Sequence, residues 1–494
     1  MSGQVKSLSE LGLTAQAGRD AVISGVAVDS REVAPGFLFA ALPGTTVHGA
    51  AYIETALEYG ATAILTDAEG ARLAAAALAM SDAALIIAED PRQTLAYSAA
   101  LWFGAQPPVM IAVTGTNGKT SVSTFARMIW AELGHDAVNL GTTGVEGAFQ
   151  APLAHTTPEP VTLHRMLSKI AHAGVTHAAM EASSHGLAQR RLDGVHLRAA
   201  GFTNFTQDHL DYHKTFEDYF NAKAGLFDRV LSEDGVAVIN IDDPRGSDMA
   251  RIAGSRGQAV LTVGRSDQAR LRLLGQRYEA TGQQIRFSYE EQVHMCHLPL
   301  IGGFQAENVL LAAALVIGCG EDPERVFETL PHLKGVRGRM QLAAARENGA
   351  SVFVDYAHTP DAVSTALQAM RPHVMGRLVA IVGAGGDRDA TKRPLMGQAA
   401  AANADLVIVT DDNPRSEDPA VIRQAVMLGC PDAMEIGDRA EAILRGVDAL
   451  GPGDALLIAG KGHEVGQIVG DDVLPFDDVE QASMAVMALD GGLA

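Results

Sequence analysis

Short apolar runs alternate with amphipathic stretches through the first hundred residues. The runs "GVAVDS", "FLFAAL", "TAILTD" and "AALIIAED" predict strands, and "AAYIETALEYG" and "TLAYSAALWFG" predict helices between them. The alanine-rich stretch 71–80, "ARLAAAALAM", predicts a further, buried helix. Together these patterns indicate a small α/β domain over residues 1–107, with "GAQPP" as a linker.

A second block, expected over residues 108–335, begins with the apolar strand "VMIAV". A glycine-containing turn and the helix "SVSTFARMIWAELG" follow, and Gly134 ends that helix. The later runs "THAAMEA", "AAGFTNF" and "GVAVINI" are further strands, and strands that alternate with helices predict a parallel sheet. Residues 269–300 instead show the alternation and turns of an antiparallel β insertion.

The third block, residues 336–494, repeats the α/β pattern through "SVFVDYA", "RLVAIVGAG", "DLVIVTDD", "AMEIGD" and "DALLIAG". It predicts a doubly wound, Rossmann-like domain. Its "GAGG" is not the GxGxxG fingerprint, so a dinucleotide site there has weak support. The predicted fold class is therefore α/β with three domains, of which the central one carries the parallel sheet and the β insertion.

Composition narrows the classes of function. A formal net charge of −21 with no basic block argues against a nucleic-acid partner. Any polyanionic ligand must be met by local cations or by metal ions. The three cysteines have no metal-like spacing, which indicates a reducing compartment. No signal peptide and no membrane-length apolar run is evident, so we expect a cytoplasmic protein without a membrane span.

The turn after "VMIAV" has the composition of a phosphate-binding loop. A strand, the segment "GTNGKT" and a helix follow one another, so that backbone N–H groups and the helix N-terminus can face phosphates. Lys119 can reach the β- and γ-phosphates, and the Thr120 hydroxyl can bind Mg²⁺. Val113 stands where a standard loop has glycine. The alternative, a turn that only joins strand to helix, is disfavoured by the position of the Lys-Thr pair.

Two polar segments follow later strands of the second block. In "MEASSHGLAQRRL", Glu181 ends an apolar strand, where a carboxylate could hold Mg²⁺ that bridges phosphates. In "FTNFTQDHLDYH", histidines and carboxylates suggest a metal or phosphate site, although hydrogen-bonded structural use is as plausible; these residues are Asn204, Asp208, His209, Asp211 and His213. Taken alone, Lys223 in its amphipathic helix is more typical of a surface lysine.

Four polar turns follow strands of the third block. Because parallel strands end at one edge of a sheet, "VDYAHTPD", "GAGGDRDATKRP", "TDDNPRSEDP" and "AGKGHE" predict a shared cleft. Arg388, Arg415 and Glu464 would give it both signs of charge, which suits a zwitterion. For any single turn, helix caps and Asx turns explain the composition equally well.

Ordered motifs along nearly the whole chain resemble the Mur ligase family, the ATP-dependent amide-forming enzymes of peptidoglycan synthesis. They are "DSREVAPGFLFAAL", "GTNGKTS", "HTTPE", "MEASSHGL", "NFTQDHLDYH", "YFNAKAGLF", "GGFQAEN", "GVRGRM", "VDYAHTPDA", "GGDRDATKRPLM", "DDNPR" and "GKGHE". "DNPR" resembles the version that selects meso-diaminopimelate. The resemblance implies a monomeric enzyme that joins this amino acid to UDP-N-acetylmuramoyl-L-alanyl-D-glutamate, using ATP and Mg²⁺.

The resemblance also implies roles for matching positions. For ATP they are Gly115, Thr116, Asn117, Gly118, Lys119, Thr120, Asn308 and Arg339. For the UDP-linked substrate they are Val28, Ser30, Thr45, Thr46, Val47, Thr156, Thr157, Ser183, Gln189 and Arg191. For the amino acid they are Arg388, Asp412, Asn413, Pro414, Arg415, Gly460 and Glu464. The expected Mg²⁺ ligands are Thr120, Glu181, His209 and Lys223, the last as a carbamylated lysine; Lys119, His209 and Lys223 are the expected catalytic residues.

The resemblance implies phosphorylation of the substrate's carboxylate and attack by an amine on the acyl phosphate. His209 and Asp355 are both candidates for the base, and His358 lies near Asp355 in the sequence. Gln341 and His155 depart from common family residues. A folylpolyglutamate synthase is the nearest alternative, but it normally lacks the N-terminal block and "DNPR". The missing loop glycine and the third-block cluster weigh against a P-loop switch or motor, and the intact Mg²⁺ ligands weigh against a non-catalytic nucleotide-binding scaffold.

Overall fold

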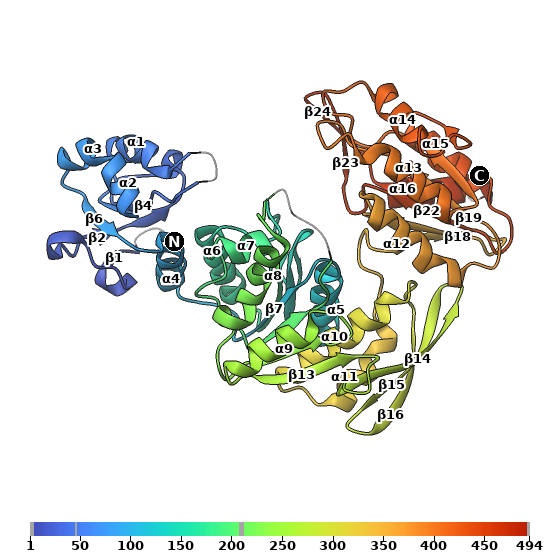
Figure 1. Cartoon of the computed structure of the whole chain (residues 1–494), viewed down its shortest axis with the longest axis horizontal. Helices are drawn as coiled ribbons and strands as arrows, with labels where there is room; N and C mark the ends of the chain where they lie inside the picture. Colours follow the sequence, from blue (N-terminus) through green and yellow to red (C-terminus); the bar gives the residue numbers. More distant parts are fainter. Residues whose placement is uncertain (1–3, 45–46, 207–211, 492–494) are drawn as a thin grey trace. The chain divides into compact units, whose positions relative to one another are not determined.

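The computed structural model describes residues 4–44, 47–206 and 212–491 (Figure 1). The chain forms two compact units: Met1–Val263 with Leu311–Pro323, and Gly264–Leu310 with Glu324–Ala494. Both are built from parallel sheets and helices, so the predicted α/β class is confirmed. Within the described ranges, no helix has the length and apolar character needed to cross a membrane.

The N-terminal part of the first unit contains a four-stranded parallel sheet in chain order. Its strands are β3 (Gly25–Ala27), β4 (Phe37–Ala40), β5 (Ala63–Thr66) and β6 (Ala84–Ile87). The helices of this part are α1 (Ile53–Glu58), α2 (Ala68–Leu73), α3 (Ala75–Ala79) and α4 (Pro91–Phe103). Along β4, Leu38 and Ala40 join one apolar core and Phe39 joins another, so both faces of the sheet are buried.

The prediction of a buried helix over residues 71–80 is wrong. The segment forms parts of two short helices, α2 and α3, which meet at Ala74 with φ −102° and ψ 17°. Ala74 is the one residue of this stretch that is buried, whereas Leu73 and Met80 are exposed. Alanine side chains remove little apolar area from water, so a run of alanines does not require burial of the helix that carries it.

A parallel sheet with β7 (Val109–Thr114) at its centre forms the rest of the first unit (Figure 1). From one side to the other, its strands are β13 (Ala259–Gly264), β12 (Val236–Asn240), β11 (Ala199–Phe202), β7, β10 (His177–Glu181), β8 (Ala137–Gly141) and the antiparallel β9 (Gly144–Gly147). Its helices include α5 (Lys119–Glu132), α6 (Pro160–His172), α7 (Ser184–Ala188), α8 (Phe216–Gly225) and α9 (Gly246–Ser255). The chain after β7 builds β8 and β10 on one side and β11 on the other, so β7 lies at the switch point where α/β sheets bind ligands.

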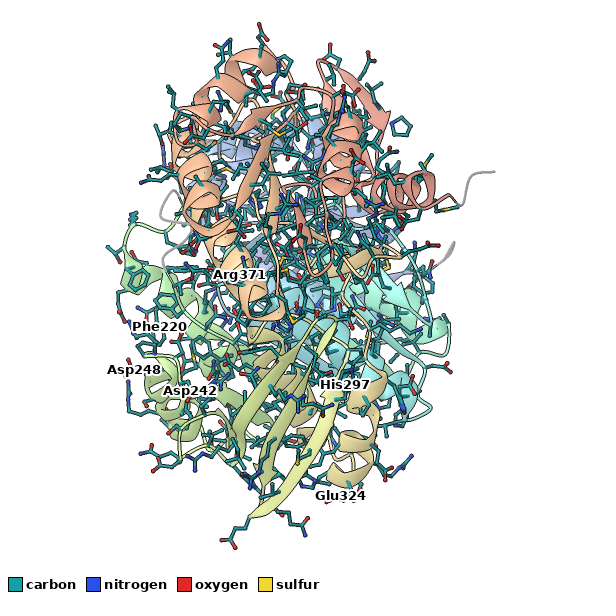
Figure 2. The ribbon with its side chains drawn as sticks, turned by 90° about the vertical axis from the view of Figure 1, so that its right-hand side faces the viewer. Phe220, Asp242, Asp248, His297, Glu324 and Arg371 are labelled. Atoms are coloured by element: carbon teal, nitrogen blue, oxygen red, sulfur yellow. The ribbon has the colours of Figure 1, made fainter. Side chains whose placement is uncertain are left out.

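The second unit contains the predicted β insertion and a second parallel sheet. The insertion is an antiparallel meander of β14 (Leu271–Glu279), β15 (Gly282–Tyr289) and β16 (Gln292–Leu298), on which His297 lies (Figure 2). The sheet has the order β17 (Gln341–Ala345), β18 (Ser351–Asp355), β22 (Ala455–Ala459), β19 (Leu378–Val382), β20 (Leu406–Val409) and β21 (Met434–Glu435). All neighbours pair in parallel except β17 and β18.

Both faces of this second sheet are covered by helices. Leu378, Ala380 and Val382 pack in one core, and Val379 and Ile381 pack in the other. The covering helices are α12 (Pro360–Met370), α13 (Lys392–Asn403), α14 (Pro419–Met427), α15 (Arg439–Asp448) and α16 (Asp478–Leu489). The chain also forms α10 (Phe304–Gly318), α11 (Pro323–Thr329) and a hairpin of β23 (Gly466–Val469) and β24 (Asp472–Pro475). The predicted Rossmann-like domain is confirmed.

Candidate functional site

The glycine loop after β7 has the backbone geometry of a phosphate-binding turn. Gly115 has φ +151° and Gly118 has φ +85°, values that residues with a Cβ rarely adopt. A Cβ at Gly115 would lie 1.8 Å from Thr203 Oγ1, so the loop could not approach β11 with a larger residue there. Gly118 directly precedes α5, whose N-terminus therefore faces the loop.

Hydrogen bonds from the segment after β11 hold this loop in place. The backbone N–H of Thr116 donates to the Asn204 carbonyl over 2.9 Å. The N–H of Asn117 donates to Asn204 Oδ1 over 2.9 Å. Thr203 Oγ1 donates to the Asn117 carbonyl over 2.6 Å. Asn204, which the sequence placed in a possible ligand segment, therefore shapes the loop.

Lys119 lies over the loop that precedes it. Its Nζ donates to the carbonyl oxygens of Gly115 and Thr116, each over 2.9 Å. The ammonium group is thus held at the position where the loop would surround a phosphate. Its contacts agree with the predicted role, which remains a prediction.

The predicted pair Thr120 and Glu181 meets beneath the loop. Thr120 Oγ1 donates to Glu181 Oε2 over 3.0 Å, and the Thr142 N–H donates to Glu181 Oε1 over 2.8 Å. Glu181 ends β10 and is only 2% exposed. A Cβ at Gly141 would lie 1.9 Å from Glu181 Oε1, so this glycine makes room for the carboxylate.

Further predicted residues form a chain of hydrogen bonds that starts at Glu181. Thr157 Oγ1 donates to the Glu181 carbonyl over 2.9 Å, and Arg191 Nη1 donates to the Thr157 carbonyl over 2.6 Å. Arg191 also donates through Nη2 to Gln189 Oε1 over 2.8 Å. The guanidinium is partly buried, and burial lowers the pKa of Arg191 from its ordinary value.

Thr156 and Ser183 join the same region. The Thr142 and Thr156 hydroxyls lie 3.0 Å apart, and Ser183 Oγ accepts the Gly186 N–H over 3.0 Å as the cap of α7. Sequence analysis missed Thr142, although it directly follows β8 at the same sheet edge as Glu181. Its position after a parallel strand is the signal that could have identified it.

Lys223 is buried, contrary to what its helix pattern alone favoured. Its side chain on α8 is 1% exposed, and Nζ donates to the Gly115 carbonyl over 2.6 Å. The ammonium also lies 4.5 Å from the centre of the Tyr219 ring. His209, Asp208 and Asp211 lie outside the described residues, whereas His213 is buried 5.2 Å from the Tyr219 ring.

Three of the predicted uridine-side residues belong to the described N-terminal part of the chain. Val28 and Ser30 follow β3, with Ser30 buried, and Val47 is 51% exposed. Thr45 and Thr46 lie outside the described residues. Their part in substrate binding stays a prediction.

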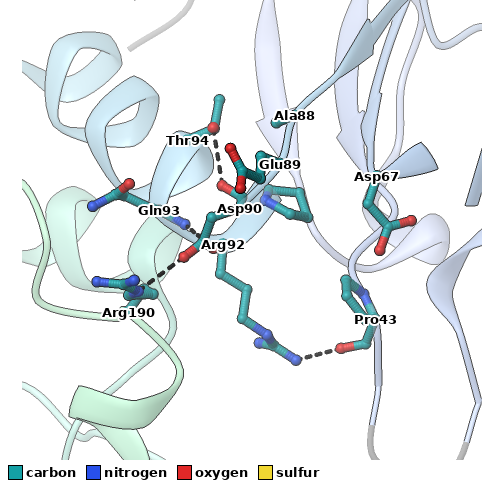
Figure 3. A pocket seen from close by; sticks show the side chains of 10 residues that line it. Pro43, Asp67, Ala88, Glu89, Asp90, Arg92, Gln93, Thr94 and Arg190 are labelled. Carbon is teal, nitrogen blue, oxygen red and sulfur yellow. Dashed lines mark hydrogen bonds and ion pairs between the residues drawn. The ribbon is translucent and has the colours of Figure 1, made fainter. Parts of the chain in front are cut away.

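A pocket of about 750 Å³ lies close to β6 and the start of α4 (Figure 3). Arg92 donates to the Pro43 carbonyl, and Arg190 Nε lies 2.9 Å from Asp90 Oδ2. Val28, Ser30 and Val47 are not among its lining residues. Sequence analysis missed this pocket, although "AEDPRQT" is a polar turn after a parallel strand, the signal used elsewhere.

In the second unit, three loops at the carboxyl ends of strands come together. Arg415 Nη1 donates to the Gly386 carbonyl over 2.8 Å, and Asn413 Nδ2 donates to Glu464 Oε2 over 2.8 Å. Arg388 belongs to the same loop as Gly386 and donates to the Asp387 carbonyl over 3.3 Å. These contacts agree with the predicted cleft.

Backbone strain and close approach mark the same loops. Arg415 has φ +53°, which is uncommon for a residue with a side chain. Gly460 has φ +116°, and a Cβ there would lie 2.5 Å from Asp412 Oδ2. A Cβ at Gly386 would lie 1.9 Å from the Pro414 carbonyl oxygen. The predicted residues Asp412, Pro414 and Gly460 are therefore tightly packed parts of this edge.

Sequence analysis missed Lys461, which organises this cluster. Its side chain is fully buried, and Nζ donates to Asn413 Oδ1 and to Glu464 Oε2, both over 3.1 Å. The lysine thereby orients two residues predicted to hold the amino acid. Its place between Gly460 and Gly462, after a buried strand, was the available signal.

Arg339, Asp355 and His358 surround Tyr356. The Arg339 guanidinium lies 4.9 Å from the centre of the Tyr356 ring, and the Met340 N–H donates to Asp355 Oδ2 over 2.8 Å. Burial raises the pKa of Asp355 and lowers the pKa of His358. The upward shift brings Asp355 nearer to the neutral range expected of a general base, whereas the downward shift keeps His358 neutral but makes it a weaker base.

Asn308 is buried on α10 and donates through Nδ2 to Gln305 Oε1 over 3.2 Å. Asn308 and Arg339 belong to the second unit and the glycine loop belongs to the first. The predicted contacts of these two residues with the nucleotide stay predictions.

Three family models match successive parts of the chain. "Mur ligase family, catalytic domain" matches residues 22–102, "Mur ligase middle domain" residues 113–316, and "Mur ligase, glutamate ligase domain" residues 338–462. The matched ranges together cover most of the chain and follow the order of the three predicted domains, whose boundaries remain predictions.

Curated relatives extend the match to nearly full length. A protein of Caulobacter vibrioides is 49% identical over 478 residues, covering 95% of this chain and 97% of the relative. One of Zymomonas mobilis is 46% identical and covers 99% of this chain and 100% of the relative. Both are named UDP-N-acetylmuramoyl-L-alanyl-D-glutamate--2,6-diaminopimelate ligase.

A solved structure with the same ligase name has a TM-score of 0.74 and 34% identity, and covers 98% of this chain and 99% of that one. A folylpolyglutamate synthase of Mycobacterium tuberculosis, solved with ADP and AMPPCP, is 20% identical with a TM-score of 0.61, covering 81% of this chain and 95% of that one; it shares the fold. The three family models, the full-length identity and the loop, sheet and cleft geometry lead to one conclusion: the chain belongs to the Mur ligase family.

Proposed function

We propose that this chain is the ATP-dependent ligase that adds meso-2,6-diaminopimelate to UDP-N-acetylmuramoyl-L-alanyl-D-glutamate in peptidoglycan precursor synthesis. The observation that carries the proposal is the match of almost the entire chain, at 46% to 49% identity, to relatives with that name. The hydrogen-bonded path from Thr120 through Glu181 and Thr157 to Arg191 supports it, because it links the nucleotide loop to residues expected to bind the second substrate.

The glycine loop and Lys119 would hold the triphosphate of ATP. A carboxylate that approaches the γ-phosphate is repelled by about 1 kcal/mol per unit-charge pair at 4 Å in water, and by several-fold more in a drier site. Lys119 would offset this repulsion and stabilise the phosphoryl group in transfer. The loop amides and the N-terminus of α5 would add fixed positive potential.

The donor set beneath the loop fits Mg²⁺. Glu181 offers a buried carboxylate, and the Thr120 hydroxyl lies 3.0 Å from it, so hard oxygen ligands are already together. His209 and a carbamylated Lys223 would complete the set. A carbamate nitrogen keeps one hydrogen, so the Lys223 bond to the Gly115 carbonyl could persist after modification. When bound, Mg²⁺ would neutralise phosphate charge during transfer.

The reaction would proceed in two steps. The γ-carboxylate of the substrate's D-glutamate attacks the γ-phosphorus of ATP, and ADP leaves. The neutral amine of diaminopimelate then attacks the acyl phosphate carbon, forming the amide and releasing inorganic phosphate. His209 or Asp355 would take the proton that the amine loses.

The cleft of the second unit would hold diaminopimelate. Arg415 and Arg388 can bind a carboxylate, and Glu464 can receive an ammonium group. Asn413 and Lys461 keep Glu464 in place through bonds of 2.8 and 3.1 Å. We further propose that the enzyme acts as a monomer in the cytoplasm.

The test uses purified protein with ATP, Mg²⁺ and the UDP-linked dipeptide. ADP and a product heavier by one diaminopimelate residue should appear only when diaminopimelate is present. Replacing it with lysine should reduce the rate strongly, because lysine lacks the second carboxylate. ADP release at an equal rate without any amino acid would contradict the proposal. In a parallel reaction with tetrahydrofolate and glutamate as the substrates, a glutamylated folate product would support the folylpolyglutamate alternative instead.

A further inference from the structure

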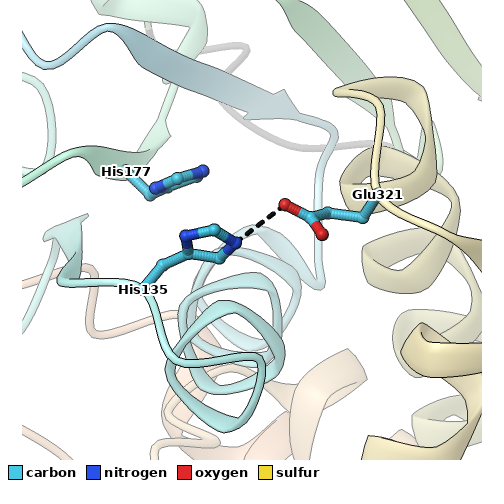
Figure 4. A group of neighbouring side chains, drawn as sticks. All are labelled: His135, His177 and Glu321. Carbon is cyan, nitrogen blue, oxygen red and sulfur yellow. Dashed lines mark hydrogen bonds and ion pairs between the residues drawn. The ribbon is translucent and has the colours of Figure 1, made fainter.

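Three side chains with metal-binding chemistry meet in the first unit, away from the predicted phosphate site (Figure 4). His135 follows α5, His177 begins β10, and Glu321 follows α10. One ligand atom from each lies within 4.8 Å of the others. His177 is 7% exposed, while the His135 and Glu321 side chains are 32% and 20% exposed, so the cluster is sheltered yet open to an ion from solvent.

The three groups already face one another. His135 Nε2 lies 2.8 Å from Glu321 Oε1, and the rings of His135 and His177 have their centres 4.1 Å apart (Figure 4). A hydrogen bond holds the His135–Glu321 pair at a separation close to that of two ligand atoms on one ion. A metal bound here would replace the shared proton between His135 and Glu321.

A second hydrogen-bonded chain orients His177. The Thr176 hydroxyl lies 3.3 Å from the Asp136 carbonyl and 2.8 Å from His177 Nδ1. When the hydroxyl donates to the carbonyl, its oxygen accepts from a protonated Nδ1, and the lone pair of Nε2 is then available as a ligand. Burial, with His135 nearby, lowers the pKa of His177 to about 4, which agrees with a neutral ring.

This cluster is distinct from the predicted Mg²⁺ site. His177 and Glu181 are the first and last residues of β10, so a rise of about 3.3 Å per residue separates their Cα atoms by about 13 Å. The two sites also differ in chemistry, because Glu181 has oxygen neighbours and the cluster offers two imidazoles. Imidazole favours zinc-like transition metals over Mg²⁺.

We propose that His135, His177 and Glu321 bind one divalent transition-metal ion of the zinc class, with water as a fourth ligand. Two histidines and one glutamate are an established ligand set for tetrahedral zinc with an open position. Tetrahedral bonds of about 2.0 to 2.1 Å need ligand atoms about 3.4 Å apart. The ligand atoms now lie within 4.8 Å of one another and the two imidazole planes meet at 35°, so binding would turn both rings toward the ion. The ion would tie the end of α5, the helix that begins at the glycine loop, to the start of β10 and the turn after α10.

Cobalt(II) is a suitable probe because it binds at zinc sites, absorbs visible light when its coordination is tetrahedral, and quenches the fluorescence of nearby tryptophan. Trp130 on α5 is buried with its ring 5.0 Å from that of His177, so it would report binding. The metal-free full-length protein is titrated with Co²⁺ in millimolar Mg²⁺. We expect one equivalent to bind with a visible d–d band and quenched fluorescence, and Zn²⁺ to abolish the band.

Substitutions of the proposed ligands test whether Co²⁺ binds at this cluster. Glu321→Gln keeps an acceptor for His135 but loses the anionic ligand, so Co²⁺ affinity should fall by about 10-fold to 100-fold. His177→Gln should abolish the band. His297→Gln is the matched control. His297, labelled in Figure 2, has its Nδ1 3.5 Å from Glu279 Oε2, a His–carboxylate pair outside the cluster, and Co²⁺ binding should be unchanged.

Two results would overturn the proposal. One is the absence of a stoichiometric d–d band in the unmodified protein. The other is equal Co²⁺ affinity in the unmodified protein and in Glu321→Gln, which would place the ion elsewhere. Because Glu321 is half-buried and its replacement is isosteric, circular dichroism should confirm that this variant is folded. None of these readouts depends on ligase activity, so the outcome is independent of the proposed function.

Discussion

Each of the two parallel sheets with a predicted ligand site carries its polar groups at the carboxyl ends of its strands, but the two sheets hold their lysine side chains in different ways. At the carboxyl end of β7, Asn204 holds the glycine loop by accepting from the Thr116 and Asn117 N–H groups, and Lys119 donates to two neutral carbonyls of that loop. At the carboxyl ends of β20 and β22, Lys461 is fully buried and bonds to Asn413 and Glu464. Lys119 is only partly buried, so its ammonium group can exchange these carbonyls for a phosphate. Lys461 is fully buried and also bonds to the Gly466 carbonyl and to the Glu464 carboxylate, so it forms a fixed frame for a smaller ligand. Lys119 should therefore act directly on the charge of the substrate, and Lys461 should act through Asn413 and Glu464.

The largest effect is expected from Lys119→Met. Loss of the cation at the transferring phosphate should lower kcat by about 100-fold to 1,000-fold. Steady-state ADP release measures this. Lys169→Met, at an exposed position of α6, is the control and should retain full activity. A reduction of less than threefold in Lys119→Met would contradict a role for Lys119 at the transferring phosphate.

Glu181→Gln should have the next largest effect. The amide oxygen can still accept from the Thr142 N–H, and the amide NH2 can donate to the Thr120 hydroxyl. The amide is a weaker Mg²⁺ ligand than the carboxylate, so half-maximal activity should require at least about tenfold more Mg²⁺. Activity is measured against Mg²⁺ concentration. Glu181→Asp keeps the charge and should recover part of the affinity; identical Mg²⁺ curves for all three proteins would remove Glu181 from the metal site.

Arg415→Ala tests whether this arginine binds a carboxylate of diaminopimelate in the cleft of the second unit. Loss of a charged hydrogen bond to a carboxylate should raise the KM for diaminopimelate by about 10-fold to 100-fold and leave the KM for ATP within about twofold. Arg445→Ala, which removes an exposed guanidinium on α15, is the control. Equal changes in both KM values would argue against an amino-acid pocket here.

The smallest effect is expected from Lys461→Met, because this lysine would act through Glu464 and Asn413. The KM for diaminopimelate should rise by about fivefold to tenfold with little change in kcat. Lys461→Arg should not restore it, since a guanidinium is too large for the fully buried position. A fall in kcat as large as that of Lys119→Met would contradict the contrast between the two lysines.

Local patterns in the sequence predicted most of the fold and the outline of the site. Apolar runs identified the four strands β3 to β6 of the N-terminal sheet, β7, β10, β11 and β12 of the central sheet, and β18 to β22 of the C-terminal sheet, but not β8, β9, β13 or β17. Gly115 and Gly118 marked a turn that needs unusual φ angles. Glu181 and the third-block turns were found because parallel strands end at one edge. These features depend on neighbours in the chain, so periodicity and residue type are enough to reveal them.

Features that depend on which segments pack together were decided by the tertiary structure. The helix pattern around Lys223 suggests an exposed side chain, but α8 places it against Gly115, 108 residues away in sequence. Residues 71–80 appear suited to a core but lie mostly on the surface. The His135–Glu321 contact joins residues 186 positions apart. A sequence determines what each segment can form, whereas burial and charge pairing depend on the neighbours that the assembled sheets supply.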